Sequence, residues 1–132
     1  MYRLTIMMMI TLCMGLIADA ASAEDSTVYE LRTYTTNEGK LENLQDRFRD
    51  HTLKLFEKHG MKSIGYWIPT DRVETLTYLL QHNSKAAAEL SWKAFMADPA
   101  WQKVYADSII NGRLVSNIDS TFMAATAYSP MK

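Results

Sequence analysis

The chain has 132 residues, with 14 lysines and arginines against 15 aspartates and glutamates and a formal net charge of −1. This balance, with no basic patch and no acidic tail, gives no reason to expect nucleic acid as a partner. The single cysteine, Cys13, lies in the first apolar segment. Residues after that segment therefore cannot form a disulfide, a zinc–thiolate site or a cysteine nucleophile.

Residues 1–23 are predicted to be a secretory signal. Arg3 gives a basic start, Leu4 to Ile17 is an almost uninterrupted apolar run, and Ala21 and Ala23 are small residues of the kind that signal peptidase reads. A membrane anchor is the alternative, but the run is shorter than the about 20 apolar residues that cross a bilayer. We therefore expect cleavage after Ala23 and a secreted or periplasmic mature protein without a membrane span.

Residues 24–132 are predicted to form one domain. Val28–Thr35 is dense in β-branched and aromatic residues and predicts a strand. From Lys40 to His59 the apolar residues recur with helical spacing. Gly60 follows at the position where glycine commonly ends a helix.

Two further strands are predicted at Lys62–Ile68 and Glu74–Gln81. The link between them, which begins at Pro69, is short, so the two strands should pair as an antiparallel hairpin.

The second half of the domain is predicted to hold two helices and a last strand. Ser84 can cap a helix that runs to about Ala97. Asp98 and Pro99 form a cap followed by proline at the first helical position, which predicts another helix to about Gly112. The last strand is expected around 120–125.

The order β-α-β-β-α(α)-β predicts an α+β fold of the ferredoxin-like type, with a four-stranded antiparallel sheet and its helices on one face. Such a sheet should alternate apolar and polar residues, but residues 64–68 and 76–80 are apolar at both parities. We expect a second copy of the chain to cover the open face, giving a homodimer with a barrel-like interior. The alternative is a monomer with an exposed aromatic face.

Glu30, Arg32 and Tyr34 share one parity of the first strand, which is an unusual set for a central strand. Buried charges need partners. These residues therefore predict either a polar cavity, in which Arg32 could also act in catalysis, or an ion pair that fixes the strand register.

The three histidines differ in their predicted roles. His51 falls on the apolar stripe of its helix beside Phe48. This position predicts either a proton shuttle or a core histidine. His59 is expected to complement the helix dipole, and His82 is expected at the surface. Their spacing is not that of metal ligands, and no metal site is predicted.

Trp67 lies beside Gly65, so a cavity could open where the glycine lacks bulk; a close helix–sheet contact is the alternative. The chain has no nucleophile elbow, phosphate loop or dinucleotide fingerprint. No cofactor is predicted.

Several segments together resemble one known family, the NIPSNAP domain, over about Val28 to Ser129. The segments that carry the resemblance are Tyr29–Tyr34, Gly39–Leu41, His51, His59–Gly60, Gly65–Trp67 and Asp98–Trp101. The stretches Phe48–Thr52 and Ser91–Phe95 are most similar to those of small secreted bacterial members. The resemblance implies a dimeric α+β barrel, a superfamily that includes cofactor-free oxygenases, haem-degrading enzymes and isomerases, so the fold does not decide the activity.

The first functional hypothesis is an exported homodimer that binds a small apolar or amphipathic ligand between its sheet and helices. Its proposed contacts are Glu30, Arg32, Tyr34, His51 and Trp67. The second hypothesis is an oxygenase, isomerase or haem-handling enzyme in which His51 is the base and Arg32 holds an anionic oxygen. The third is a non-catalytic module that binds a protein partner through its outer helices.

Overall fold

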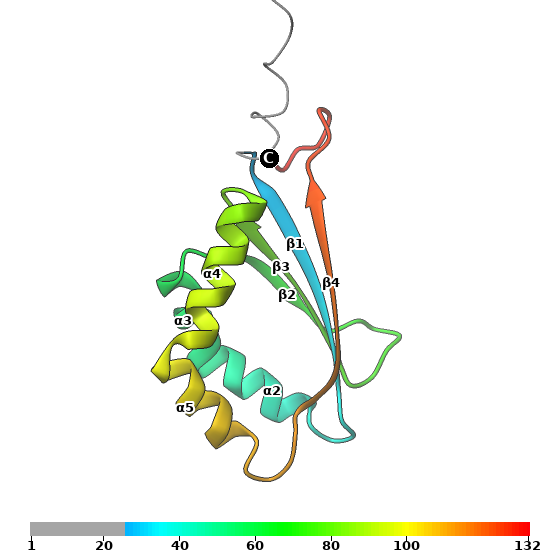
Figure 1. The fold of residues 1–132 in the computed structure, drawn as a ribbon. Helices are drawn as coiled ribbons and strands as arrows, with labels where there is room; N and C mark the ends of the chain where they lie inside the picture. The colour runs from blue at the N-terminus through cyan, green and yellow to red at the C-terminus, as the bar shows by residue number, and fades with distance from the viewer. Residues whose placement is uncertain (1–25) are drawn as a thin grey trace, which may run out of the picture.

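The computed structural model describes residues 26–132, so the predicted signal at residues 1–23 lies outside the described residues. The elements follow in the expected order (Figure 1). They are β1 (Val28–Thr36), α2 (Leu41–Arg47), the π-helical turn η1 (Phe48–Thr52), α3 (Leu53–Lys58), β2 (Lys62–Trp67), β3 (Thr75–His82), α4 (Lys85–Ala97), α5 (Pro99–Ser108) and β4 (Val115–Ala124).

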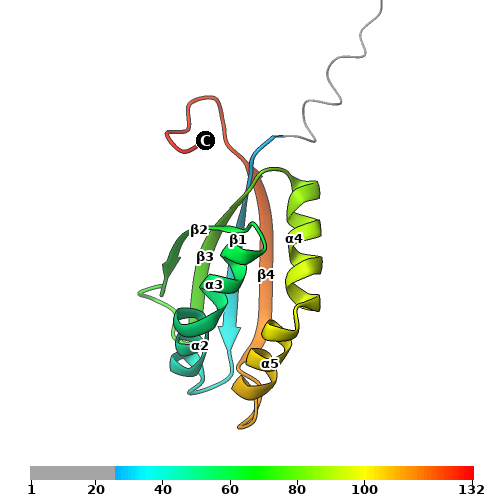
Figure 2. The ribbon, with the colours of Figure 1, turned by 90° about the vertical axis from the view of Figure 1, so that its left-hand side faces the viewer.

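The four strands form one antiparallel sheet in the order β2-β3-β1-β4. All the helices lie on one face of this sheet, as Figures 1 and 2 show. The predicted ferredoxin-like α+β fold and the β2–β3 hairpin are thereby confirmed. Among residues 26–132, no helix combines the length and the apolar character needed to cross a membrane.

The first helical segment contains a wide turn that the sequence pattern did not predict. In η1 the backbone N–H of Leu53 donates to the carbonyl of Phe48, five residues earlier, which is the π-helical pattern. The hydroxyl of Thr52 also donates to the carbonyl of Arg47, at 3.1 Å. The wide turn gives the buried stripe a spacing of four residues; it consists of Leu44, Phe48, Thr52 and Phe56.

This spacing corrects the expectation for His51. A regular helix of 3.6 residues per turn would place position 51 on the stripe. The wide turn buries Thr52 instead and leaves His51 exposed. His51 is therefore not a core histidine.

Helix ends form where the sequence predicts them. Gly60 has φ +75°, and the N–H groups of Gly60 and Met61 donate to the carbonyls of Glu57 and Phe56, which is a Schellman motif. The side chain of Ser84 accepts a hydrogen bond from the N–H of Ala87 at 3.0 Å. Asp98 likewise accepts from the N–H of Ala100 at 2.8 Å.

Strand β4 begins earlier than the expected position near residue 120. It spans Val115–Ala124 and pairs with β1 along that length, with a register shift opposite Thr35 and Thr36. Its first half, Val115 to Asp119, has only two apolar residues, Val115 and Ile118, and they do not alternate with polar ones. Backbone hydrogen bonds to β1 therefore hold this part of the chain as an edge strand, although its side-chain pattern does not predict one.

The core lies between the sheet and the helices. Paired residues of an antiparallel sheet point to the same face, so Tyr34, Leu76 and Tyr78 face the helices together. The opposite face carries Leu31 and Leu79 as a pair, and no helix covers it. On that face Trp67 is 52% exposed.

Candidate functional site

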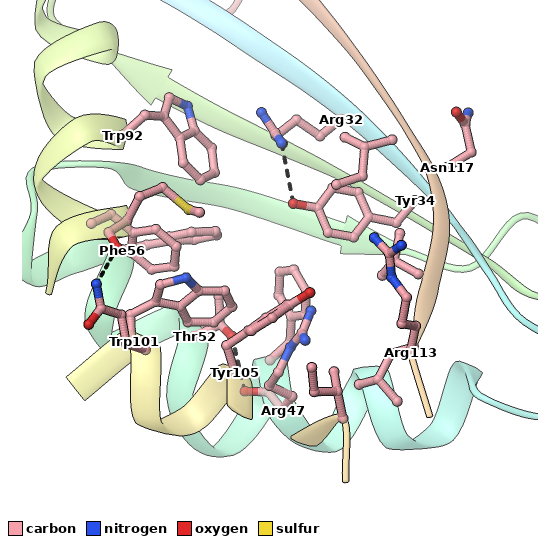
Figure 3. A pocket seen from close by; sticks show the side chains of 18 of the residues that line it. Arg32, Tyr34, Arg47, Thr52, Phe56, Trp92, Trp101, Tyr105, Arg113 and Asn117 are labelled. Carbon is pink, nitrogen blue, oxygen red and sulfur yellow. Dashed lines mark hydrogen bonds between the residues drawn. The ribbon is translucent and has the colours of Figure 1, made fainter. Parts of the chain in front are cut away.

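A chamber of about 730 Å³ lies between the helix-facing side of β1 and β4 and the helical layer (Figure 3). Aromatic side chains form much of its wall: Phe48, Phe56, Trp92, Phe95, Trp101 and Tyr105. The volume falls in the range of about 300–1,000 Å³ that is usual for small-molecule sites. The chamber is therefore the main candidate for a functional site among the described residues.

The chamber opens along β4. Ile118 pairs with Tyr34 and so points toward the helices, yet it is 47% exposed. Figure 2 shows α4 on the β4 side of the sheet, whereas α2 and α3 lie in front of β2 and β3. Because Ile118 lines the chamber and its side chain is still exposed, a molecule could enter from solvent past it.

Glu30 is the centre of a buried hydrogen-bond network beside the chamber. Its carboxylate accepts from four donors that come from three strands and a helix: Arg32 Nη1 at 2.6 Å, Trp92 Nε1 at 2.7 Å, Ser120 Oγ at 2.8 Å and His82 Nε2 at 2.9 Å. Burial alone would raise the pKa of Glu30, but these hydrogen bonds outweigh it and lower the pKa to about 2. The residue is therefore a carboxylate at neutral pH and not a proton donor.

Arg32 joins this network to the chamber wall. Its guanidinium carbon lies 4.2 Å from the centre of the Trp92 ring, and Nη2 donates to the hydroxyl of Tyr34 at 3.3 Å. Burial opposes the positive charge, but the oxygens of Tyr34, Tyr78 and Glu30 outweigh burial and raise the pKa of Arg32. Arg32 is thus a fixed cation whose charge Glu30 balances.

Tyr34 carries a hydroxyl at the chamber surface. That oxygen accepts from the hydroxyl of Tyr78 at 3.0 Å as well as from Arg32. Among residues 26–132, nothing accepts the proton of Tyr34 itself. Tyr34 can therefore donate a hydrogen bond to a molecule in the chamber.

Arg47 is a second buried cation in the wall, and its environment differs. It is 6% exposed, its Nη1 donates to the hydroxyl of Ser108 at 3.1 Å, and its guanidinium lies over Trp101 and Tyr105 at 5.2 and 5.7 Å. Burial lowers the pKa of Arg47. Among the described residues it has no ion pair with a carboxylate, and its Nε is buried without a hydrogen-bond partner.

Of the residues predicted for the site, the structure brings Glu30, Arg32 and Tyr34 together. His51 lies elsewhere, in an exposed hollow between α2 and α5 that Lys103 also lines. Trp67 lies on the open face of the sheet, where its ring covers Gly65 so closely that a Cβ there would be 2.5 Å from the indole. The side chains of His51 and Trp67 therefore do not reach the chamber.

The structure corrects the prediction for His82 and adds a contact to that for His59. His82 is buried at 2% exposure, not at the surface, because it continues the inward parity of Tyr78 and Leu80 on β3. In the sequence, this shared parity could have predicted that His82 is buried. His59 ends α3 and its Nε2 lies 2.7 Å from Asp98, so it joins two helices as well as lying at a helix end.

The sequence analysis did not identify Trp92, Ser120 or Arg47 as part of the site. Arg47 could have been noticed because it lies beside Leu44 and Phe48 on the inward side of its helix. The contacts of Glu30 with Trp92 and Ser120 join residues 62 and 90 positions apart and have no local signal. Within residues 26–132, no group of three or more histidine, cysteine or acidic residues could hold a metal ion.

Comparisons with known proteins agree with this architecture. The model of the NIPSNAP family matches residues 29–130. A NIPSNAP family protein from Agrobacterium tumefaciens str. C58 is 16% identical, with a TM-score of 0.72 over 80% of this chain and 99% of that one. An uncharacterized NIPSNAP-like domain protein from Burkholderia xenovorans is 15% identical, with a TM-score of 0.70 over 80% of this chain and 90% of that one.

A more distant likeness is to SnoaB, a cofactor-independent oxygenase from Streptomyces nogalater. It is 14% identical, with a TM-score of 0.58 over 80% of this chain and 98% of that one. No curated protein matches the chain. At these identities the solved structures show a shared fold and leave the activity open.

Proposed function

The chain belongs to the NIPSNAP family, and from this premise we propose that it is an exported, homodimeric protein that binds a small amphipathic molecule in the chamber. The observation that carries the proposal is the cavity of about 730 Å³ with its aromatic wall. A concave, largely apolar cavity of this size with a few polar groups is the usual setting of a small-molecule site.

The polar groups of the chamber support an amphipathic ligand over a wholly apolar one. Arg32 and the hydroxyl of Tyr34 lie on the sheet side, whereas Phe56 and Trp101 face them from the helical side. A few fixed polar groups within an apolar wall orient a ligand, which is the usual composition of a binding site.

The open face of the sheet supports the homodimer. Leu31, Leu79 and Met123 lie on this face with Trp67, and each strand contributes to it. An apolar surface of this kind on a monomer promotes association. A second copy of the chain provides a matching surface through a twofold axis.

Binding can be tested with 2-naphthol as a neutral aromatic probe, titrated into the purified mature protein by calorimetry. The variant Ile118→Trp places a large ring at the mouth of the chamber and should weaken binding at least about tenfold. Ile110→Trp makes the same change at an exposed isoleucine outside the chamber and should bind as the parent protein does. Absence of binding in the parent, or equal binding by both variants, would contradict the proposal.

Export rests on the pattern of residues 1–23 and can be tested separately. The full chain should be produced in a bacterium with an outer membrane, and its mass should be measured in the periplasmic and extracellular fractions. A protein that begins at Glu24 is expected there. An unprocessed chain in the cytoplasm would rule out the signal.

A cofactor-independent oxygenase is the second candidate, and the pairing of Arg32 with Tyr34 favours it. Two donors at one point of an apolar wall could stabilise an oxygen anion of a phenolic substrate. His51, the base expected from the sequence, lies outside the chamber, so this candidate has no assigned base. Oxygen uptake with 1,3-dihydroxynaphthalene above the rate without protein would support it, and Arg32→Met should abolish the excess.

A further inference from the structure

We propose that the molecule bound in the chamber is a monoanion, an aromatic carboxylate, and that Arg47 holds its carboxylate group. This inference rests on the proposed function and adds the chemical class of the ligand. It follows from the charges of the chamber wall.

The wall carries three arginines, Arg32, Arg47 and Arg113, and no aspartate or glutamate. They come from β1, from α2 and from the segment before β4, and Figure 3 shows them around one space. The whole chain, in contrast, has a formal net charge of −1. The lining of the chamber is therefore positively charged, although the chain as a whole is not.

Only one of the two buried arginines has a counter-charge. Arg32 forms an ion pair with Glu30 at 2.6 Å. The guanidinium of Arg47 has only the hydroxyl of Ser108 as a hydrogen-bond partner among residues 26–132. A buried cation without an anion is unfavourable, so the unbalanced charge of Arg47 calls for an anion from outside the chain.

The surroundings of Arg47 favour a carboxylate attached to a ring. The guanidinium carbon lies 5.2 Å from the centre of the Trp101 ring and 5.7 Å from that of Tyr105, while Nε has an unsatisfied N–H. Planar guanidinium groups bind planar carboxylates through paired N–H donors. One unpaired buried guanidinium balances one negative charge, and the aromatic wall accommodates the ring.

Arg113 adds a role in attracting the ligand. It is exposed, lines the same chamber and has no ion pair with an acidic residue among the described residues. An exposed cation at the mouth of an apolar cavity increases the local concentration of anions.

The test compares 2-naphthoate with 2-naphthalenemethanol, which has the same ring system and no charge, by calorimetry at pH 7 in a phosphate-free buffer. The parent protein should bind 2-naphthoate about 10- to 100-fold more tightly than the alcohol. Arg47→Met should remove this preference and leave binding of the alcohol unchanged. Arg72→Met, at an exposed arginine outside the chamber, should keep the preference.

The outcomes separate this inference from the proposed function. If both probes bind the parent equally, or if the preference survives Arg47→Met, the anion site is wrong and the chamber remains a ligand site. If neither probe binds, both proposals fall. Should Arg47→Met not fold by circular dichroism, Arg47→Lys keeps the charge without the planar fork, and it should weaken 2-naphthoate about tenfold without affecting the alcohol; an unchanged preference would overturn the inference.

Discussion

Glu30 and His82 form a buried hydrogen bond across neighbouring strands, with Oε2 of Glu30 lying 2.9 Å from Nε2 of His82. Both side chains are 1% exposed. The other partners of the carboxylate, Arg32, Trp92 and Ser120, also donate to it. Because a carboxylate can only accept, His82 must carry a proton on Nε2.

Glu30→Gln should destabilise the domain by about 3 kcal/mol. The amide NH₂ of glutamine would face donors only, and the charge of Arg32 would lose its partner. Urea unfolding followed by circular dichroism measures the change. The matched control Glu38→Gln, at an exposed turn residue, should stay within about 0.5 kcal/mol of the parent; a similarly small effect at Glu30 would contradict the network as the source of stability.

Acid should destabilise the protein through the same carboxylate. The pKa of Glu30 is about 2 in the folded chain against 4.5 for the free group, so below pH 4.5 the unfolded chain binds the proton more readily. The contribution of Glu30 is complete above pH 4.5 and is lost as the pH falls toward 2, on the order of 2 kcal/mol. Urea midpoints at pH 6, 4 and 3 measure it.

The acid dependence should be shallower in Glu30→Gln. It should not vanish, since hydrogen bonds from Lys58 and His59 also lower the pKa of Asp98. Parallel pH profiles for the parent and Glu30→Gln would show that Glu30 does not ionise as described.

The proposed dimer can be tested with a charge on the open face. Leu79 lies there opposite Leu31, so Leu79→Lys should give a monomer by size exclusion with light scattering, because a buried lysine without a partner is unfavourable. Leu90→Lys makes the same change on the exposed side of α4 and should leave the dimer intact. A parent protein that is monomeric at high concentration would end the proposal.

Local sequence signals predicted the element order and the helix ends, because they act within a few residues. Ser84 and Asp98 cap their helices through bonds to N–H groups two or three positions away. The three polar residues of β1 also come together as their shared parity predicts. Which helical residues these three side chains contact could not be predicted from the local sequence.

The features that sequence analysis missed depend on tertiary contacts. The wide turn at Phe48–Thr52 shifts the buried stripe by one position and moves His51 to the surface. The burial of His82 is stabilised by Glu30, which is 52 positions away. At His51 packing decided the outcome against the helical periodicity, whereas at His82 the parity of β3 already pointed inward.

Gly60 should be required for the end of α3. Its φ of +75° is unfavourable for a residue with a Cβ, and Gly60→Ala should cost about 1–2 kcal/mol in urea unfolding. The nearest atom to a new Cβ is the Ser91 hydroxyl at 3.8 Å, so the cost would not come from a clash. Gly60→Asn, which tolerates this conformation better, should lose less; equal losses would point to packing instead.

Tyr34 and Tyr78 should differ in their effects although one hydrogen bond joins them. Tyr78→Phe removes one donor from the Tyr34 oxygen and should cost about 1 kcal/mol. Tyr34→Phe removes the acceptor of both Tyr78 and Arg32, which leaves two polar groups with a lost partner, and should cost about 2 kcal/mol or more.

A double-mutant cycle isolates the bond between the two tyrosines. The loss in Tyr34→Phe/Tyr78→Phe should be smaller than the sum of the two single losses, because the phenylalanine at position 78 leaves no orphaned hydroxyl. Additive losses would show that the hydroxyls do not interact. Since Tyr34 is also the donor that faces the chamber, Tyr34→Phe alone should weaken 2-naphthol binding, whereas Tyr78→Phe should change it little.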